Sequence, residues 1–82
     1  MTLEDAKKLF ELQEEEGYSV MIQKSGYVDS FAYITESDGK YTYSSEVFSG
    51  RSLSEVNLED VEVYRHATEW DEYLEKREYQ ET

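Results

Sequence analysis

The sequence predicts one small α+β domain in which two helices flank an antiparallel β-meander. Three observations lead to this class. Apolar residues recur at helical spacing near both ends of the chain and alternate with polar residues in its middle. Turn sequences separate the alternating segments. At 82 residues the chain has room for one hydrophobic core, so we expect residues 1–82 to form a single domain.

Residues 2–16 are expected to form the first helix. Its predicted inner face carries residues spaced about three or four apart: Leu3, Ala6, Leu9, Phe10 and Gln13. Thr2 can cap the amino end, and Gly17 suits the left-handed residue that ends many helices. The helix closes on three consecutive glutamates, at the end where the helix dipole favours cations instead.

The middle of the chain is expected to form three antiparallel strands, over residues 18–24, 27–35 and 40–48. The turn between the first two strands is predicted at Ser25-Gly26, and the next turn at Ser37-Asp38-Gly39. In the first strand, the pattern puts Tyr18, Val20 and Ile22 on one side. Further along, residues 61–66 alternate over a short span, which is typical of either a short fourth strand or a bend.

Residues 49–60 contain one local signal, because Ser52 and Glu55 have the spacing of a capping box and favour a short helical turn. Residues 68–80 are expected to form the second helix, with Thr68 as its cap. One face of that helix gathers the large side chains: Trp70, Tyr73, Leu74 and Arg77.

Aromatic residues make up 15% of the chain, which favours a folded domain because disordered acidic segments are poor in them. Several fall on the predicted strands: Tyr27, Phe31, Tyr33, Tyr41 and Tyr43. Core packing is the simplest role for these side chains. The alternative is that one sheet face stays open and forms a partner-binding surface or the interface of a homodimer.

The chain carries 20 acidic and 8 basic residues, a formal net charge of −12. Such a charge opposes binding to nucleic-acid phosphates or to an anionic membrane surface. The net charge is −4 over residues 1–16, −1 over residues 17–54 and −7 over residues 55–82. The predicted sheet is therefore nearly neutral between two acidic flanks. These flanks are either ordinary solvated helix faces or an organised anionic surface that binds a basic protein.

No pattern in the sequence indicates an enzyme, a cofactor or a metal site. There are no cysteines, and the single histidine, His66, lacks the partners of a catalytic triad. Glu62 lies four residues before His66, which suits a metal on a helix, but this segment is predicted to be extended. No apolar run approaches the roughly 18 residues of a membrane span, and no signal-peptide pattern opens the chain. We therefore expect a cytoplasmic protein.

The order of these segments resembles that of small acidic phage proteins that inhibit CRISPR RNA-guided nucleases by mimicking DNA. The similar stretches are GYSVMI at the first strand, YITESDGKYTY at the hairpin and EWDEYLEKREYQ at the second helix. The chain departs from that family at Gly17 and Lys40, where the family has acids. The resemblance implies that four acids contact the basic site that reads the short DNA signal beside the target: Asp38, Glu69, Asp71 and Glu72.

Two shorter stretches, DGKYTY and SGRSLSE, are similar to a phage inhibitor of uracil-DNA glycosylase, which is also a DNA mimic. Both resemblances imply an inhibitor of a basic nucleic-acid-binding protein, acting in the host cytoplasm if a phage encodes it. We add the paired carboxylates Glu59 and Asp60 to the predicted partner-binding residues, since they belong to the most acidic segment. The alternatives are an immunity or antitoxin-like protein that neutralises a basic nuclease, and a protein-interaction domain of another kind.

Overall fold

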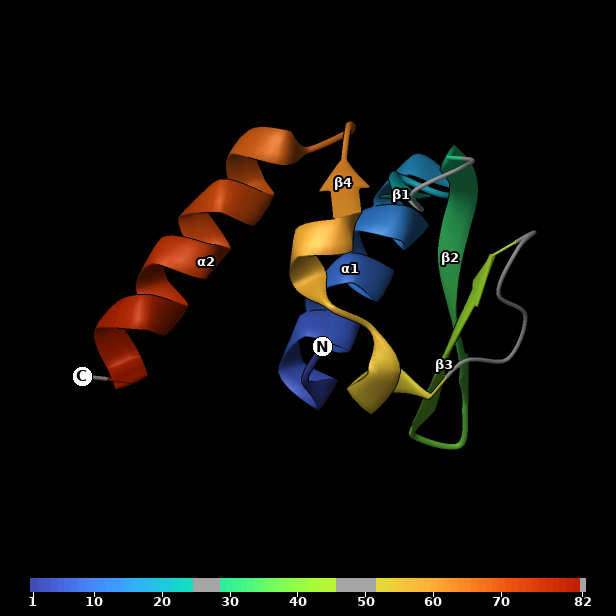
Figure 1. Ribbon diagram of the computed structural model, residues 1–82, viewed down its shortest axis with the longest axis horizontal. Coiled ribbons are helices and arrows are strands. Elements are labelled where there is room, and N and C mark those ends of the chain that lie inside the picture. The colour runs from blue at the N-terminus through green and yellow to red at the C-terminus, as the bar shows by residue number, and fades with distance from the viewer. Residues whose placement is uncertain (25–28, 46–51, 82) are drawn as a thin grey trace.

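A computed structural model describes residues 1–24, 29–45 and 52–81, with side chains as far as Arg77 (Figure 1). The helices and strands are α1 (Leu3–Glu16), β1 (Met21–Lys24), β2 (Asp29–Ser37), β3 (Lys40–Ser45), β4 (Val61–Val63) and α2 (Ala67–Glu81). Two short 3₁₀ turns, η1 (Leu53–Glu55) and η2 (Leu58–Asp60), precede β4. The predicted α+β class is confirmed.

The four strands form one antiparallel sheet in the order β3-β2-β1-β4, so the short alternating segment near residue 62 is a strand and not a bend. The turn at Asp38 and Gly39 joins β2 to β3, and both residues have positive φ angles, 50° and 81°. Two successive positive φ angles match the right-handed twist of a tight hairpin, as the Asp-Gly pair predicts. The predicted turn at Ser25-Gly26 and the end of the third strand, residues 46–48, lie outside the described residues.

α1 packs on β2 and β3, and α2 lies beside α1 on the side away from these two strands (Figure 1). The helices run antiparallel. Arg77, late in α2, reaches Asp5 at the start of α1, and His66, just before α2, reaches Glu16 at the end of α1. α2 contacts α1 through Tyr73 and Arg77, and it reaches the core through Trp70.

The core lies between α1 and the sheet, and Trp70 of α2 closes it at one side. Its buried residues are Ala6, Leu9, Leu12, Val20, Met21, Ala32, Ile34, Tyr43, Val56, Val63 and Trp70. One polar side chain completes the sheet: the Gln13 amide donates to the carbonyl of Ile34 at 2.8 Å and accepts from its N–H at 3.0 Å. Because β1 pairs with β2 only as far as Ala32, Gln13 supplies the bonds that a strand would make there.

Local capping signals in the sequence are confirmed at α1. Thr2 and Asp5 form a reciprocal capping box, and Gly17 ends the helix with a φ of 77°. The predicted cap of α2 is wrong: the helix begins at Ala67, so Thr68 lies inside its first turn and His66 precedes it with a φ of 60°. None of the described helices is long and apolar enough to span a membrane.

Two details of the predicted helix face and first strand also change. Leu3 is half exposed, whereas Leu12, which the spacing argument omitted, is fully buried. In β1 the buried side chains are Met21 and Gln23, and Ile22 lies on the opposite face. A one-residue shift of this kind exchanges the two faces of a strand. In a short strand, an alternating pattern therefore predicts that a strand forms more reliably than it predicts which face is buried.

Candidate functional site

The predicted partner-binding acids are all exposed, but the fold does not bring them together. Asp38 lies at the β2–β3 turn, whereas Glu69, Asp71 and Glu72 lie in the first two turns of α2. In Figure 1 the hairpin turn is at the bottom of the molecule and the start of α2 is at the top. The hairpin turn and α2 are thus two separate surfaces, and a partner that contacts both would have to span the molecule.

Three exposed carboxylates lie close together on α2, and one of them, Glu72, also lines a groove with Lys8 and Lys76. Asp71 and Glu75 are four residues apart, and Glu72 lies three residues before Glu75, so the three side chains are neighbours on the helix surface. All three are exposed, and none has an ion-pair partner among the described residues. We call Asp71, Glu72 and Glu75 the α2 acidic face. Glu75 was missed from the sequence, although its helical spacing could have indicated it.

Glu59 and Asp60 project from η2. The side-chain oxygen Oδ1 of Asn57 accepts the N–H of Glu59 at 3.2 Å and caps this short turn. On either side of the two acids, Leu58 and Val61 pack against the core. Because the residues on both sides are held by the core, Glu59 and Asp60 between them remain exposed at the surface.

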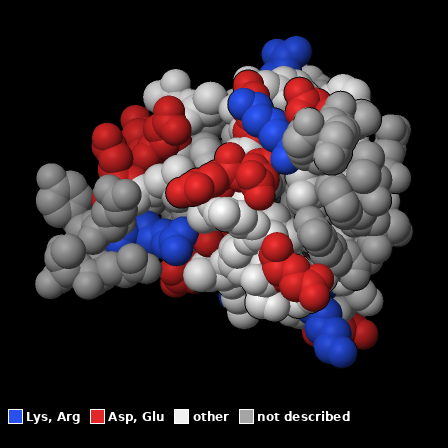
Figure 2. Space-filling model, viewed as in Figure 1, with Lys and Arg blue, Asp and Glu red and all other residues white. Residues whose placement is uncertain are grey.

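Most exposed carboxylates in the described part of the chain have no described cation within ion-pair distance. Glu62 is one exception, because it pairs with Lys24 at 2.9 Å. The exposed acids that make no ion pair with a described residue include Glu4, Glu11, Glu14, Asp38, Glu55, Glu59, Asp60, Asp71, Glu72 and Glu75. On the face drawn in Figure 2 the acids form several groups with neutral and basic side chains between them.

Charge is mixed where α1 and α2 face each other. A groove of about 290 Å³ lies there, lined by Glu4, Lys7, Lys8, Glu11, Tyr73, Lys76 and Arg77. The lysines in this groove offset the neighbouring glutamates, so the groove interrupts the anionic surface. The α2 acidic face is therefore bounded on one side by cations.

One acid has a structural role. The Asp5 carboxylate is fully buried and accepts from the backbone N–H of Thr2, the hydroxyl of Tyr73 and Nη1 of Arg77, at 2.8–3.0 Å. Burial and the bond to Asp5 raise the pKa of the Tyr73 hydroxyl, which therefore stays a donor. Asp5 joins the two helices and adds nothing to the anionic surface.

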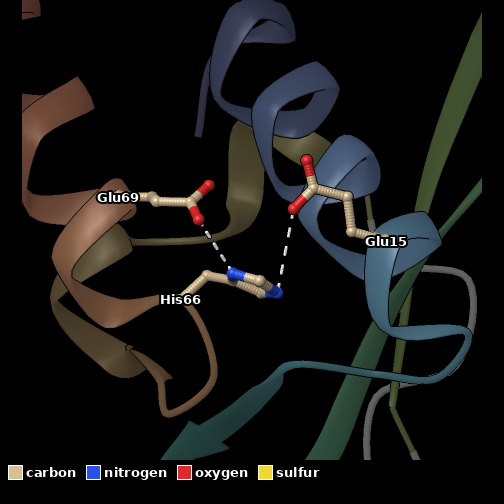
Figure 3. A group of neighbouring side chains, drawn as sticks. All are labelled: Glu15, His66 and Glu69. Carbon is tan, nitrogen blue, oxygen red and sulfur yellow. Dashed lines mark hydrogen bonds and ion pairs between the residues drawn. The ribbon is translucent and has the colours of Figure 1, made fainter.

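The single histidine lies in a group of glutamates where the end of α1 meets the start of α2 (Figure 3). Its Nδ1 lies 3.0 Å from Glu69 Oε1, and its Nε2 lies 2.8 Å from Glu16 Oε1 and 3.8 Å from Glu15 Oε2. The hydrogen bond to Glu69, with the charges of the other two glutamates, raises the pKa of His66. Glu62, considered from the sequence as its neighbour, instead pairs with Lys24.

The aromatic residues predicted for the sheet divide between its two faces. Tyr43 is buried in the core, and Tyr41 packs edge-on against Phe10 of α1. Phe31 and Tyr33 are exposed on the opposite face, where Phe31 also meets Tyr64 edge-on. Core packing is thus confirmed for Tyr43, whereas a partner-binding or homodimer role of the exposed Phe31 and Tyr33 stays a prediction. Tyr27 lies outside the described residues.

Comparison with known proteins gives no further guide to this site. A scan against protein-family models and searches of curated proteins and of solved structures find no match for the chain. The resemblance to phage DNA mimics therefore stays a prediction.

Proposed function

We propose that the protein binds a basic, nucleic-acid-binding protein through its α2 acidic face and thereby blocks the partner's site for DNA or RNA. The observation that carries this proposal is the exposure of Asp71, Glu72 and Glu75 without cationic partners in the described part of the chain. Carboxylates that already had ion pairs would have to break them before binding a partner. These three can accept lysine or arginine side chains directly.

The scaffold favours this role because it holds the acidic face in place. Trp70 is buried on the core side of α2, and Arg77 anchors the helix to the buried carboxylate of Asp5. A helix fixed on its inner face presents the outer carboxylates from an ordered backbone, so only their side chains need ordering when a partner binds. A site that binds nucleic-acid phosphates recognises a row of negative charges, which positions the nucleic acid without reading its sequence.

The resemblance in the sequence favours an RNA-guided nuclease of bacteria as the target, with a DNA-repair glycosylase as the second choice. An immunity or antitoxin-like protein would use the same kind of surface against a toxic nuclease. The two roles differ in the neighbourhood of this protein's own gene, a phage early operon for the inhibitor and a toxin gene for the immunity protein. They differ also in the partner's toxicity to the cell when the acidic protein is absent.

Capture of a partner from bacterial lysate, followed by binding measurements with the purified partner, tests the proposal. The test variant, D71N/E72Q/E75Q, replaces the three carboxylates of the α2 acidic face with the corresponding amides. The matched control, E4Q/E11Q/E14Q, removes the same number of charges from exposed positions of α1 that make no ion pair with a described residue. We expect binding to weaken by about tenfold or more in the α2 variant, since each charged hydrogen bond contributes about 1.5–3 kcal/mol.

The control variant should bind with nearly the affinity of the original chain, and rising salt should weaken the complex. Equal loss in both variants would show that only net charge matters. Capture that neither salt nor added DNA reduces would contradict mimicry of nucleic acid. Asp38→Asn tests the hairpin turn separately, because the fold places it on another surface.

A further inference from the structure

We propose that His66, Glu15 and Glu16 form a binding site for Zn²⁺ or a similar divalent transition metal, with Glu69 as the residue that orients the imidazole. The site lies where the last turn of α1 meets the residue before α2. It is independent of the partner-binding role proposed above.

The donor atoms are already close together. One ligand atom from each of Glu15, His66 and Glu69 lies within 4.8 Å of the others, and Glu16 Oε1 lies 2.8 Å from Nε2 of the histidine. Zn²⁺ takes imidazole nitrogen and carboxylate oxygen at about 2.0–2.2 Å, so these oxygens need to move only slightly apart to admit an ion. Both side chains from α1 reach solvent, which leaves them free to make that adjustment.

The hydrogen bond between Nδ1 of His66 and Glu69 leaves the other ring nitrogen, Nε2, available to bind a metal. A carboxylate only accepts hydrogen bonds, and His66 makes a hydrogen bond to a described residue at Nδ1, to Glu69 at 3.0 Å, but none at Nε2; in the neutral ring the tautomer with the proton on Nδ1 therefore keeps that bond. The lone pair is then on Nε2, the nitrogen that faces the two α1 glutamates. Nε2 is also buried and has no hydrogen bond of normal geometry to a described residue, despite its short distance to Glu16. A histidine oriented by a carboxylate on its far nitrogen is the usual arrangement of a metal ligand.

The charge at the end of α1 independently favours a cation at this place. The last turn holds Glu14, Glu15 and Glu16 and no basic residue, and it is also the negative end of the helix dipole. A bound divalent ion would offset both. The imidazole nitrogen favours a transition metal over Mg²⁺ or Ca²⁺, which take oxygen ligands almost exclusively.

Titration of the full chain with ZnCl₂ by calorimetry, alongside ¹⁵N NMR of the imidazole, tests the site. We expect one Zn²⁺ per chain and a large shift of the Nε2 resonance, with Mg²⁺ at the same ionic strength causing neither. His66→Asn should abolish this binding. Asparagine is the suitable replacement because it tolerates the positive φ of this position. Circular dichroism of the variant checks its fold.

The remaining variants separate a built site from diffuse attraction to an acidic surface. E15Q/E16Q should lose most of the affinity, and Glu69→Ala should weaken it by about 10–100-fold, as loss of an orienting residue does elsewhere. Glu14→Gln is the matched control, because Glu14 is exposed on the same turn and has no ion pair with a described residue. Equal losses in Glu14→Gln and E15Q/E16Q, or an unmoved Nε2 resonance in the original chain, would overturn the proposal.

Discussion

Replacing Arg77 with methionine is expected to destabilise the protein by about 3 kcal/mol. Asp5 is fully buried, and Arg77 Nη1 lies 2.8 and 2.9 Å from its two carboxylate oxygens. Removing one member of a buried ion pair costs about 3–5 kcal/mol, because the other charge stays buried without compensation. We expect the lower end, because 25% of the Arg77 side chain is exposed and two further donors remain on Asp5.

Urea unfolding followed by the fluorescence of Trp70 measures this loss. Trp70 is the single tryptophan, and it is buried and stacked on Tyr73, which itself bonds to Asp5, so its emission reports on the α1–α2 contact. The midpoint should fall while the dependence of the unfolding free energy on urea stays constant. Lys76→Met is the matched control: its side chain is exposed and makes no ion pair with a described residue, so we expect a change within about 0.5 kcal/mol.

A second substitution separates the ion pair from simple loss of packing. In an Asp5→Asn background the site no longer holds a buried charge, so Arg77→Met should cost much less than it does in the original chain. Equal costs in both backgrounds, or a loss below about 1 kcal/mol in the single variant, would show that the ion pair between Arg77 and Asp5 does not stabilise the fold.

Three further predictions concern single positions. Thr2→Ala should cost about 1 kcal/mol in urea unfolding, with Thr2→Ser close to unchanged, because the capping box needs the hydroxyl. Gly17→Ala should cost about 1–2 kcal/mol, because its φ of 77° is unfavourable for residues with a Cβ; an unchanged midpoint would contradict this. The raised pKa of His66 means that the folded chain holds this proton more tightly than the unfolded chain. The stabilising effect of this proton is complete below the ordinary pKa of 6.5 and is lost as pH rises through the pKa of His66 in the folded chain. In urea unfolding with EDTA present, the free energy of unfolding of His66→Asn should therefore fall less over this pH range than that of the original chain.

The fold was largely predictable because its signals are local. The Asp38-Gly39 turn, the cap at Thr2 and the glycine after α1 each depend on a few consecutive residues, and each forms as the sequence predicts. The errors lie where tertiary packing decides. His66 takes the place before α2 that Thr68 was predicted to hold, and it bonds to Glu69 and meets the end of α1 there.

The candidate sites were harder to predict because they join distant parts of the chain. Asp5 and Arg77 are 72 positions apart, and local pattern alone assigns Asp5 to the start of one helix and Arg77 to a face of the other. Spacing likewise pairs His66 only with Glu62, a sequence neighbour, whereas its contacts come from α1 and α2. The distribution of charge along the sequence identifies the acidic segments, but the three-dimensional fold is needed to show that the hairpin turn and α2 lie on separate surfaces.

The central claim is that the α2 acidic face and nucleic acid occupy the same site on a basic partner. The most direct test is a competition titration, in which the partner's apparent Kd for its nucleic acid is measured at rising concentrations of this protein. We expect the apparent Kd to rise linearly with the concentration of the protein added, and D71N/E72Q/E75Q to give at most about a tenth of the effect. An apparent Kd that stays constant when the partner is saturated with the protein would show that both bind at once, and would contradict the claim.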